Sequence, residues 1–222
     1  MILRRDEKAN VTGREVVLGT VVKAKTYRRY VRRGFAEAML GRGVIVVEGV
    51  TEQLVIQAVA EKMEAANDGN YPLDLTGVTI FCAEGDGSMA EFGRFFVSLD
   101  LPTLAFLDKK KRIQKEQDAL DKAGFEILNE TSYEGMEELL AAEVPINHQW
   151  SYLEYIRDIA AAPKVLLPNV CPDDNKVRDF TKQVLKDSKG WGRAAELIEK
   201  CDVSELPPSI TGFLEKIYAR FP

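Results

Sequence analysis

The sequence predicts an α/β fold: a mostly parallel sheet flanked by helices, followed by a helical C-terminal extension. The first observation is a series of short apolar runs, rich in β-branched residues, that alternate with longer amphipathic stretches. The second is that these strand patterns fade after residue 133, where helical patterns separated by prolines take over. The 222 residues, of which 45% are hydrophobic and 29% charged, suffice for one large domain with an extension.

The first half of the chain supplies the expected sheet and the helices around it. A basic amphipathic helix is expected at Thr26–Leu40, and glycines end it. Val44–Val47 follows as a strand, and Thr51 would cap the next helix, Thr51–Ala66. The later strands are short apolar runs, at Val78–Ala83, Thr103–Leu107 and Phe125–Leu128. The helices between these strands are expected at Met89–Ser98 and Lys110–Ala123. This alternation predicts parallel pairing.

The second half of the chain is expected to be helical. Five helices are predicted there, at Tyr133–Ala142, His148–Ala161, Asp174–Lys186, Trp191–Cys201 and Ser209–Arg220. We therefore expect three parts: residues 1–41 as an N-terminal linker and basic helix, 42–145 as an α/β domain, and 146–222 as a helical extension.

Composition excludes several classes of function. A net charge of -5 does not indicate a general nucleic-acid binder, and a single histidine argues against zinc enzymes built on several imidazoles. Three widely spaced cysteines fit a reduced, cytoplasmic protein, and the N-terminus lacks the apolar core of a secretory signal. No stretch approaches the length needed to span a membrane, so we expect no membrane association.

Acidic residues follow three successive predicted strands. Glu48 ends the first, Glu84 and Asp86 follow the second, and Asp108 follows the third. The carboxyl ends of parallel strands meet at one edge of a sheet, where α/β proteins place their ligands. Glu52 lies four residues after Glu48, at the strand-to-helix corner, so both carboxylates can face one point. Clustered carboxylates suit a divalent cation such as Mg²⁺ or Mn²⁺.

Neighbouring motifs leave alternatives open. The glycines of Glu84-Gly85-Asp86-Gly87-Ser88 would either cradle a phosphate at a helix N-terminus or simply form a tight turn. This loop matches neither the ATP-binding P-loop nor the dinucleotide motif. The cluster Lys109-Lys110-Lys111-Arg112 would either solvate a helix or contact nucleic-acid phosphates beside the acids.

Together these motifs resemble a Toprim domain, the fold shared by topoisomerases, bacterial primases and several nucleases. The resemblance rests on Val44-Ile45-Val46-Val47-Glu48-Gly49-Val50-Thr51-Glu52, on the acidic glycine-rich corner, and on the strand that ends in Leu107-Asp108. Toprim domains place a glutamate after their first strand, which Glu48 matches, and an Asp-x-Asp motif after the third. Asp108 matches the first aspartate, but Lys110 stands at the second. Glu84, Asp86 or Glu137 would have to replace the missing acid.

The Glu-Gly-x-Thr-Glu block, preceded by a basic helix, is similar to that of the OLD (overcoming lysogenization defect) family of nucleases. Glu52 belongs to that family pattern. The segment Tyr133–Leu140 resembles the acidic motif after the fourth strand, with Glu137 as the nearest match. The segment Ser188–Glu199 resembles the family's C-terminal motif, in which Lys189 matches a basic residue near the scissile phosphate.

The resemblance implies a metal-dependent DNA endonuclease that uses two cations about 4 Å apart. Glu48, Glu52 and Asp108 would bind metal, with Asp86 and Glu137 as further candidates, and Lys189 would act in catalysis beside Glu48. Members of this family usually join the nuclease to an ABC-type ATPase, so DNA and such an ATPase domain or subunit are the expected partners. The apolar face of the helix predicted at Thr26–Leu40 would allow a homodimer.

Three alternative functions fit the same sequence. Another Toprim activity, of the primase or topoisomerase type, would use the same fold. The altered Asp-x-Asp would instead indicate a non-catalytic DNA-binding or dimerisation module. A phosphatase-like or receiver-like domain would also place acids at strand ends, although it would not require the pair Glu48 and Glu52.

Overall fold

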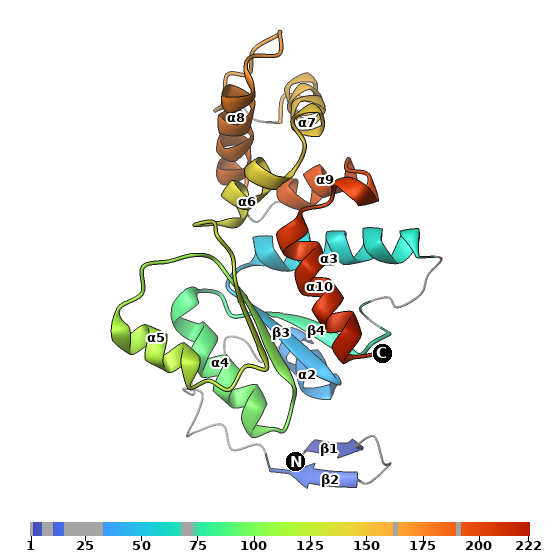
Figure 1. The fold of residues 1–222 in the computed structure, drawn as a ribbon, viewed down its shortest axis with the longest axis vertical. Coiled ribbons are helices and arrows are strands. Elements are labelled where there is room, and N and C mark those ends of the chain that lie inside the picture. The colour runs from blue at the N-terminus through green and yellow to red at the C-terminus, as the bar shows by residue number, and fades with distance from the viewer. Residues whose placement is uncertain are drawn as a thin grey trace. The chain divides into compact units, whose positions relative to one another are not determined.

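The computed structural model describes residues 2–5, 11–15, 33–67, 73, 75–161, 164–189 and 192–222. The chain forms two compact units (Figure 1). The first unit comprises Met1–Gly49, Asp74–Leu107 and Lys111–Asn129. The second unit comprises Val50–Leu73, Asp108–Lys110 and Glu130–Pro222.

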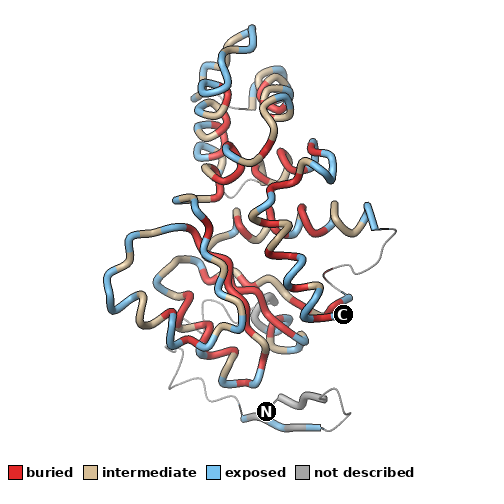
Figure 2. Tube along the Cα trace, in the orientation of Figure 1, coloured by how far each residue is buried: buried red, intermediate tan, exposed pale blue. Residues whose placement is uncertain are grey.

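A four-stranded sheet forms the centre of the first unit. Its strands are β3 (Gly43–Val47), β4 (Val78–Cys82), β5 (Thr103–Leu107) and β6 (Ile127–Glu130), in the order β4-β3-β5-β6. β3 runs parallel to both neighbours, with Val47 beside Cys82 on one side and Phe106 on the other. Every residue of β3 and β5 is buried (Figure 2), as their unbroken apolar runs predict. The predicted mostly parallel α/β sheet is thus confirmed.

Three helices complete the described part of the first unit: α2 (Arg33–Leu40), α4 (Asp86–Ser98) and α5 (Gln114–Asp121). α4 packs against β3 and β5 and contributes the rings of Phe92 and Phe96, which meet Phe81 edge to face. A hairpin of β1 (Ile2–Arg5) and β2 (Val11–Arg14) precedes them. The sequence patterns did not predict this hairpin.

The regular structure that is described in the second unit is helical. Its elements are α3 (Val50–Ala66), α6 (Met136–Glu143), α7 (Ile146–Asp158), α8 (Asp174–Asp187), α9 (Arg193–Glu199), a 3₁₀ turn η2 (Val203–Glu205) and α10 (Pro208–Arg220). α3 packs against α9 and α10, while α8 packs against α6 and α7. Tyr152 and Phe213 are among the largest side chains buried in this unit. None of the helices in the described ranges is long and apolar enough to cross a membrane.

Several predicted boundaries were wrong by one to four residues. α3 begins at Val50, so Thr51 lies inside the helix and is not its cap. α4 begins at Asp86 and not at Met89, because the chain turns at Glu84 and Gly85, whose φ angles are 53° and 138°. α5 begins at Gln114, and residues 109–113 lack regular structure.

Other elements lie close to their predicted positions. α8 matches best, because Asp173 accepts a bond from the Lys176 backbone N–H at 3.1 Å and so caps the helix. β6 lies two residues later than expected, and α6 begins three residues later. The first residues of the predicted basic helix, 26–32, lie outside the described ranges, as do Gly190 and Trp191.

Candidate metal and catalytic site

Glu48 leaves the end of β3 in the first unit and is held through its backbone. The Gly85 N–H donates to the Glu48 carbonyl at 2.8 Å, and the Ala83 N–H donates to Val47 at the same distance. Glu84 and Gly85 adopt positive φ angles at this corner, a conformation that is strained for the glutamate. The backbone of Glu48, the predicted acid after β3, is therefore hydrogen-bonded to the turn that follows β4.

Asp86, a predicted metal ligand, has a cationic partner in the first unit. Its Oδ1 lies 3.0 Å from Nη2 of Arg112. The Arg112 side chain is only 3% exposed, although the sequence places it in a basic run expected on the surface. Arg112 therefore does not share the solvated role expected for the run Lys109 to Arg112.

In the second unit, a loop brings Asp108 and Glu137 together. The Lys109 N–H donates to the Tyr133 carbonyl at 2.7 Å, which fixes the residue after Asp108 to the segment before α6. A Cβ built on Gly135 would lie 3.0 Å from Glu137 Oε2 and 3.9 Å from Asp108 Oδ2. Both carboxylates thus flank the backbone of Gly135, and a larger residue there would crowd Glu137.

Lys189 is the cationic partner of this pair. Its Nζ lies 3.4 Å from Oε1 of Glu137, whose side chain is 4% exposed. Among the described residues, none donates a well-formed hydrogen bond to Glu137 Oε1, and the ion pair with Lys189 compensates its negative charge. A buried carboxylate oxygen without a hydrogen bond is costly, so the nearby ammonium matters for its stability.

Glu52 joins the same group of charges. It lies in the first turn of α3, as predicted, and is buried together with Asp108. Burial acts to lower the pKa of the Lys189 ammonium, but Glu137, Glu52 and Asp108 outweigh it and raise that pKa. The second unit therefore gathers three predicted acids around the predicted lysine, which stays protonated.

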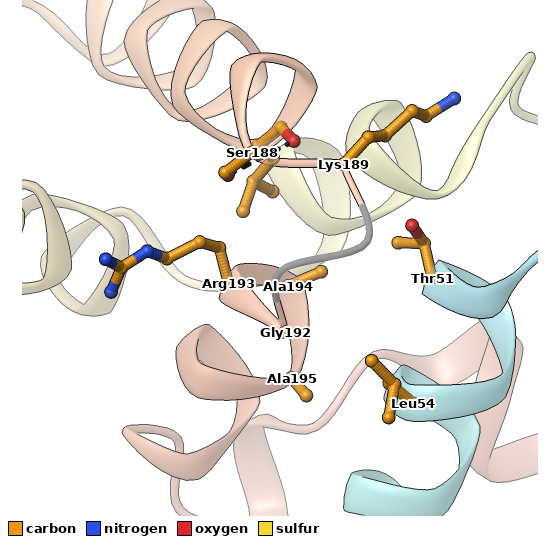
Figure 3. Close-up of a pocket in the computed structure, with 9 residues that line it drawn as sticks. Thr51, Leu54, Ser188, Lys189, Gly192, Arg193, Ala194 and Ala195 are labelled. Atoms are coloured by element: carbon orange, nitrogen blue, oxygen red, sulfur yellow. Dashed lines mark hydrogen bonds between the residues drawn. The ribbon is translucent and has the colours of Figure 1, made fainter. Parts of the chain in front are cut away.

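A small crevice lies on the other side of Lys189 (Figure 3). It is lined by residues of α3 and α9 and by the end of α8, among them Thr51, Leu54 and Ser188. Its volume of about 10 Å³ is that of one water molecule at most. Figure 3 shows the Lys189 side chain extended away from the crevice. The crevice is too small for a substrate.

The chemistry of these residues fits a hard divalent cation. Oxygen donors from carboxylates are the ligands that Mg²⁺ and Mn²⁺ prefer. Within the described ranges, however, no three Asp, Glu, His or Cys side chains are already arranged as a ligand set. Glu137 instead points at Lys189. The individual ligand roles of Glu48, Glu52, Asp108, Asp86 and Glu137 stay predictions.

Gly135 and Arg178 contribute to the site and were not anticipated. Gly135 allows the carboxylates of Glu137 and Asp108 to approach its backbone closely. The sequence shows only a glycine before a helix, and this pattern does not predict such an approach. Arg178 donates to the carbonyls of Ala141 and Ala142, the latter at 2.9 Å, near the negative end of α6. It thereby fixes the helix that carries Glu137. Sequence spacing does not predict that an arginine of α8 contacts the end of α6.

The comparison with family models matches residues 39–109 to the TOPRIM domain described as overcoming lysogenization defect protein-like. This segment contains Glu48, Glu52 and Asp108, and it ends before Lys110. A comparison with curated proteins found no match.

Among solved structures, the C-terminal region of the Xanthomonas campestris pv. campestris OLD protein is similar. It is 20% identical with a TM-score of 0.52, and the match covers 82% of this chain and 96% of that chain. The C-terminal region of the Burkholderia pseudomallei OLD protein is 18% identical with a TM-score of 0.52, covering 82% and 99%. Residues 39–109 therefore match an OLD-like TOPRIM domain, and the chain has the fold seen in the C-terminal regions of these OLD proteins.

Proposed function

We propose that this protein is a divalent-metal-dependent DNA endonuclease. The observation that carries the proposal is the gathering of Glu52, Asp108 and Glu137 around Lys189 in the second unit. Buried carboxylates gathered beside an ammonium are a costly arrangement for stability alone, and phosphodiester cleavage is a reaction that uses both. The OLD-like TOPRIM match is consistent with nuclease activity in general.

In this proposal Glu48, Glu52, Asp108 and Glu137 hold one or two Mg²⁺ or Mn²⁺ ions. A bound ion would activate water and stabilise the leaving oxygen of the phosphodiester. Glu137 takes the place of the second aspartate of Asp-x-Asp, where this chain has Lys110. Its burial and its approach to Asp108 at Gly135 support that choice over exposed Glu84.

Lys189 neutralises charge on the scissile phosphate. Three carboxylates raise its pKa, so the side chain is cationic at neutral pH. A positioned cation stabilises the additional negative charge of the transition state, which is often the largest contribution to catalysis.

DNA is the proposed substrate, and Lys109, Lys110 and Lys111 are the proposed contacts to its backbone, because cationic side chains bind phosphates regardless of base sequence. An ABC-type ATPase domain or subunit and a second copy of this chain are the further proposed partners. The ATPase partner follows from the OLD resemblance, and the second copy follows from the apolar face of the predicted N-terminal helix.

Glu48 provides the test. We expect Glu48→Ala to abolish Mg²⁺- or Mn²⁺-dependent nicking of supercoiled plasmid, because a ligand carboxylate at the sheet edge is lost. The matched control is Glu215→Ala, which removes an exposed glutamate from α10 and should nick at the wild-type rate. Nicking is followed by gel electrophoresis with and without EDTA.

Nicking by Glu48→Ala at the wild-type rate, in a preparation free of contaminating nuclease, would refute the assignment. A wild-type protein that neither nicks nor shows heat on calorimetric titration with Mn²⁺ would favour the second candidate function, a non-catalytic DNA-binding or dimerisation module. The observation that favours that candidate is Lys110 at the position of a metal-binding aspartate.

A further inference from the structure

The corner after β4, residues Ala83 to Asp86, is tied to two neighbouring segments of the first unit. On one side, its backbone donates hydrogen bonds to the carbonyls of Val47 and Glu48. On the other side, Asp86 accepts from the guanidinium of Arg112, which lies on the connection after β5. The corner therefore links the ends of three parallel strands.

The hold on Glu48 is direct. Gly85 donates its N–H to the Glu48 carbonyl at 2.8 Å. Its φ angle is 138°, a backbone conformation that residues other than glycine rarely adopt. Asp86 is the next residue and opens α4, so a shift of Asp86 moves Gly85 with it. The position of the Glu48 backbone, from which its carboxylate extends, therefore depends on where Asp86 is anchored.

The anchor is a buried charge. The Arg112 side chain is 3% exposed and the Asp86 side chain is 24% exposed. Nη2 of Arg112 lies 3.0 Å from Oδ1 of Asp86. Drawing Asp86 onto a metal ion would leave the Arg112 guanidinium without this carboxylate in a buried position, which is unfavourable. Asp86 is thus better suited to hold Arg112 than to hold a cation.

We propose that Asp86 and Arg112 are a positioning pair that seats Glu48, and that Asp86 is not a metal ligand. The effect of this pair on metal binding rests on the proposed function, whereas its effect on the Gly85 hydrogen bond does not. Residues that orient a ligand in this way typically change metal affinity or activity by about 10- to 100-fold when they are replaced.

A mutant cycle separates positioning from ligation. We expect Asp86→Asn and Arg112→Gln each to weaken Mn²⁺ binding, measured by calorimetry, by about tenfold. The double variant should bind Mn²⁺ no more weakly than the weaker-binding of the two single variants, because both changes break the same interaction. If Asp86 were a ligand, Arg112→Gln would free it, and Mn²⁺ affinity would stay at the wild-type level or rise while Asp86→Asn alone lost affinity. That pattern would overturn the proposal.

Two further measurements secure the cycle. Asp179→Asn removes one member of an exposed ion pair, Asp179 with Lys182 at 2.8 Å, and should leave Mn²⁺ binding unchanged. Hydrogen exchange at the Gly85 amide, followed by NMR in metal-free protein, should be slow in the wild type and at least tenfold faster in Arg112→Gln or Asp86→Asn. Unchanged exchange in both variants would overturn the positioning pair, whatever the nuclease assays show. If the wild type neither nicks DNA nor binds Mn²⁺, but exchange at the Gly85 amide is faster in the variants, only the proposed function is refuted.

Discussion

At the scale of single residues, the ion pair between Lys189 and Glu137 gives the candidate site two states. Without a metal ion, the ammonium compensates a carboxylate that is almost fully buried. A bound cation would take over that compensation and leave Lys189, whose side chain is 67% exposed, able to turn toward a phosphate. Under the proposed function, the same lysine would stabilise the acids before metal binds and would serve the substrate afterwards.

Lys189→Met separates these two roles. We expect Mn²⁺ affinity in calorimetry to stay at the wild-type value or to increase, because a competing cation is removed. Plasmid nicking should fall by about 10²-fold, because charge on the phosphate is no longer neutralised. Lys186→Met, an exposed position in the last turn of α8, is the control and should nick normally. Wild-type nicking by Lys189→Met would remove this residue from the catalytic site.

At the scale of elements, glycines set how closely the segments of the first unit approach each other. Gly41 ends α2, and a Cβ at this position would lie only 2.8 Å from the backbone oxygen of Gly77. The Arg42 N–H donates to that same oxygen at 2.7 Å, so the two turns lie backbone to backbone beside β3 and β4. The start of β3, and with it the register of the strand that ends before Glu48, depends on this approach.

Gly41→Ala should therefore lower the free energy of unfolding by about 1–3 kcal/mol, because the backbone oxygen cannot move aside easily. Gly212→Ala is the matched variant in α10, where a Cβ would meet no atom within 4 Å. It should raise the free energy of unfolding by about 0.5–1 kcal/mol through helix propensity. Urea denaturation measures both. Equal effects of the two substitutions would contradict the close approach at Gly41.

At the scale of the whole molecule, local patterns predicted the sheet well, because β3 and β5 are uniform apolar runs that need burial on both faces. The same patterns placed Glu48, Glu52 and Asp108 near strand ends. They failed where partners are distant in sequence: nothing local distinguishes buried Arg112 from its lysine neighbours, since its burial depends on Asp86. Helix starts were also missed where backbone conformation decides them, as at Gly85.

Global stability should depend on pH through Cys201. Burial raises the pKa of this thiol from its ordinary value of 9.0 to about 11, Lys62 acts against the shift, and Glu205 and Asp202 add to it. Because the folded pKa exceeds the unfolded one, this contribution is complete below about pH 9 and is lost as pH rises through about 11. Two pKa units correspond to about 2–3 kcal/mol.

The measurement is urea denaturation of the wild type and of Cys201→Ala between pH 8 and pH 11. Both also lose stability at high pH because burial raises the pKa of Tyr152 and Tyr218, but the wild type should lose about 2 kcal/mol more. Parallel pH profiles for the two proteins would show that ionisation of Cys201 does not oppose folding.

Lys62 also determines the orientation of a whole helix. Its ammonium donates to the carbonyls of Glu199 and Cys201, at 2.8 and 2.7 Å, at the end of α9. Glu52 lies on the same helix, about 15 Å away along the axis. These two bonds, together with the packing of α3 against α9 and α10, resist rotation of the helix about its axis. The orientation of the Glu52 carboxylate, at the start of α3, therefore depends in part on contacts made near the other end of the same helix.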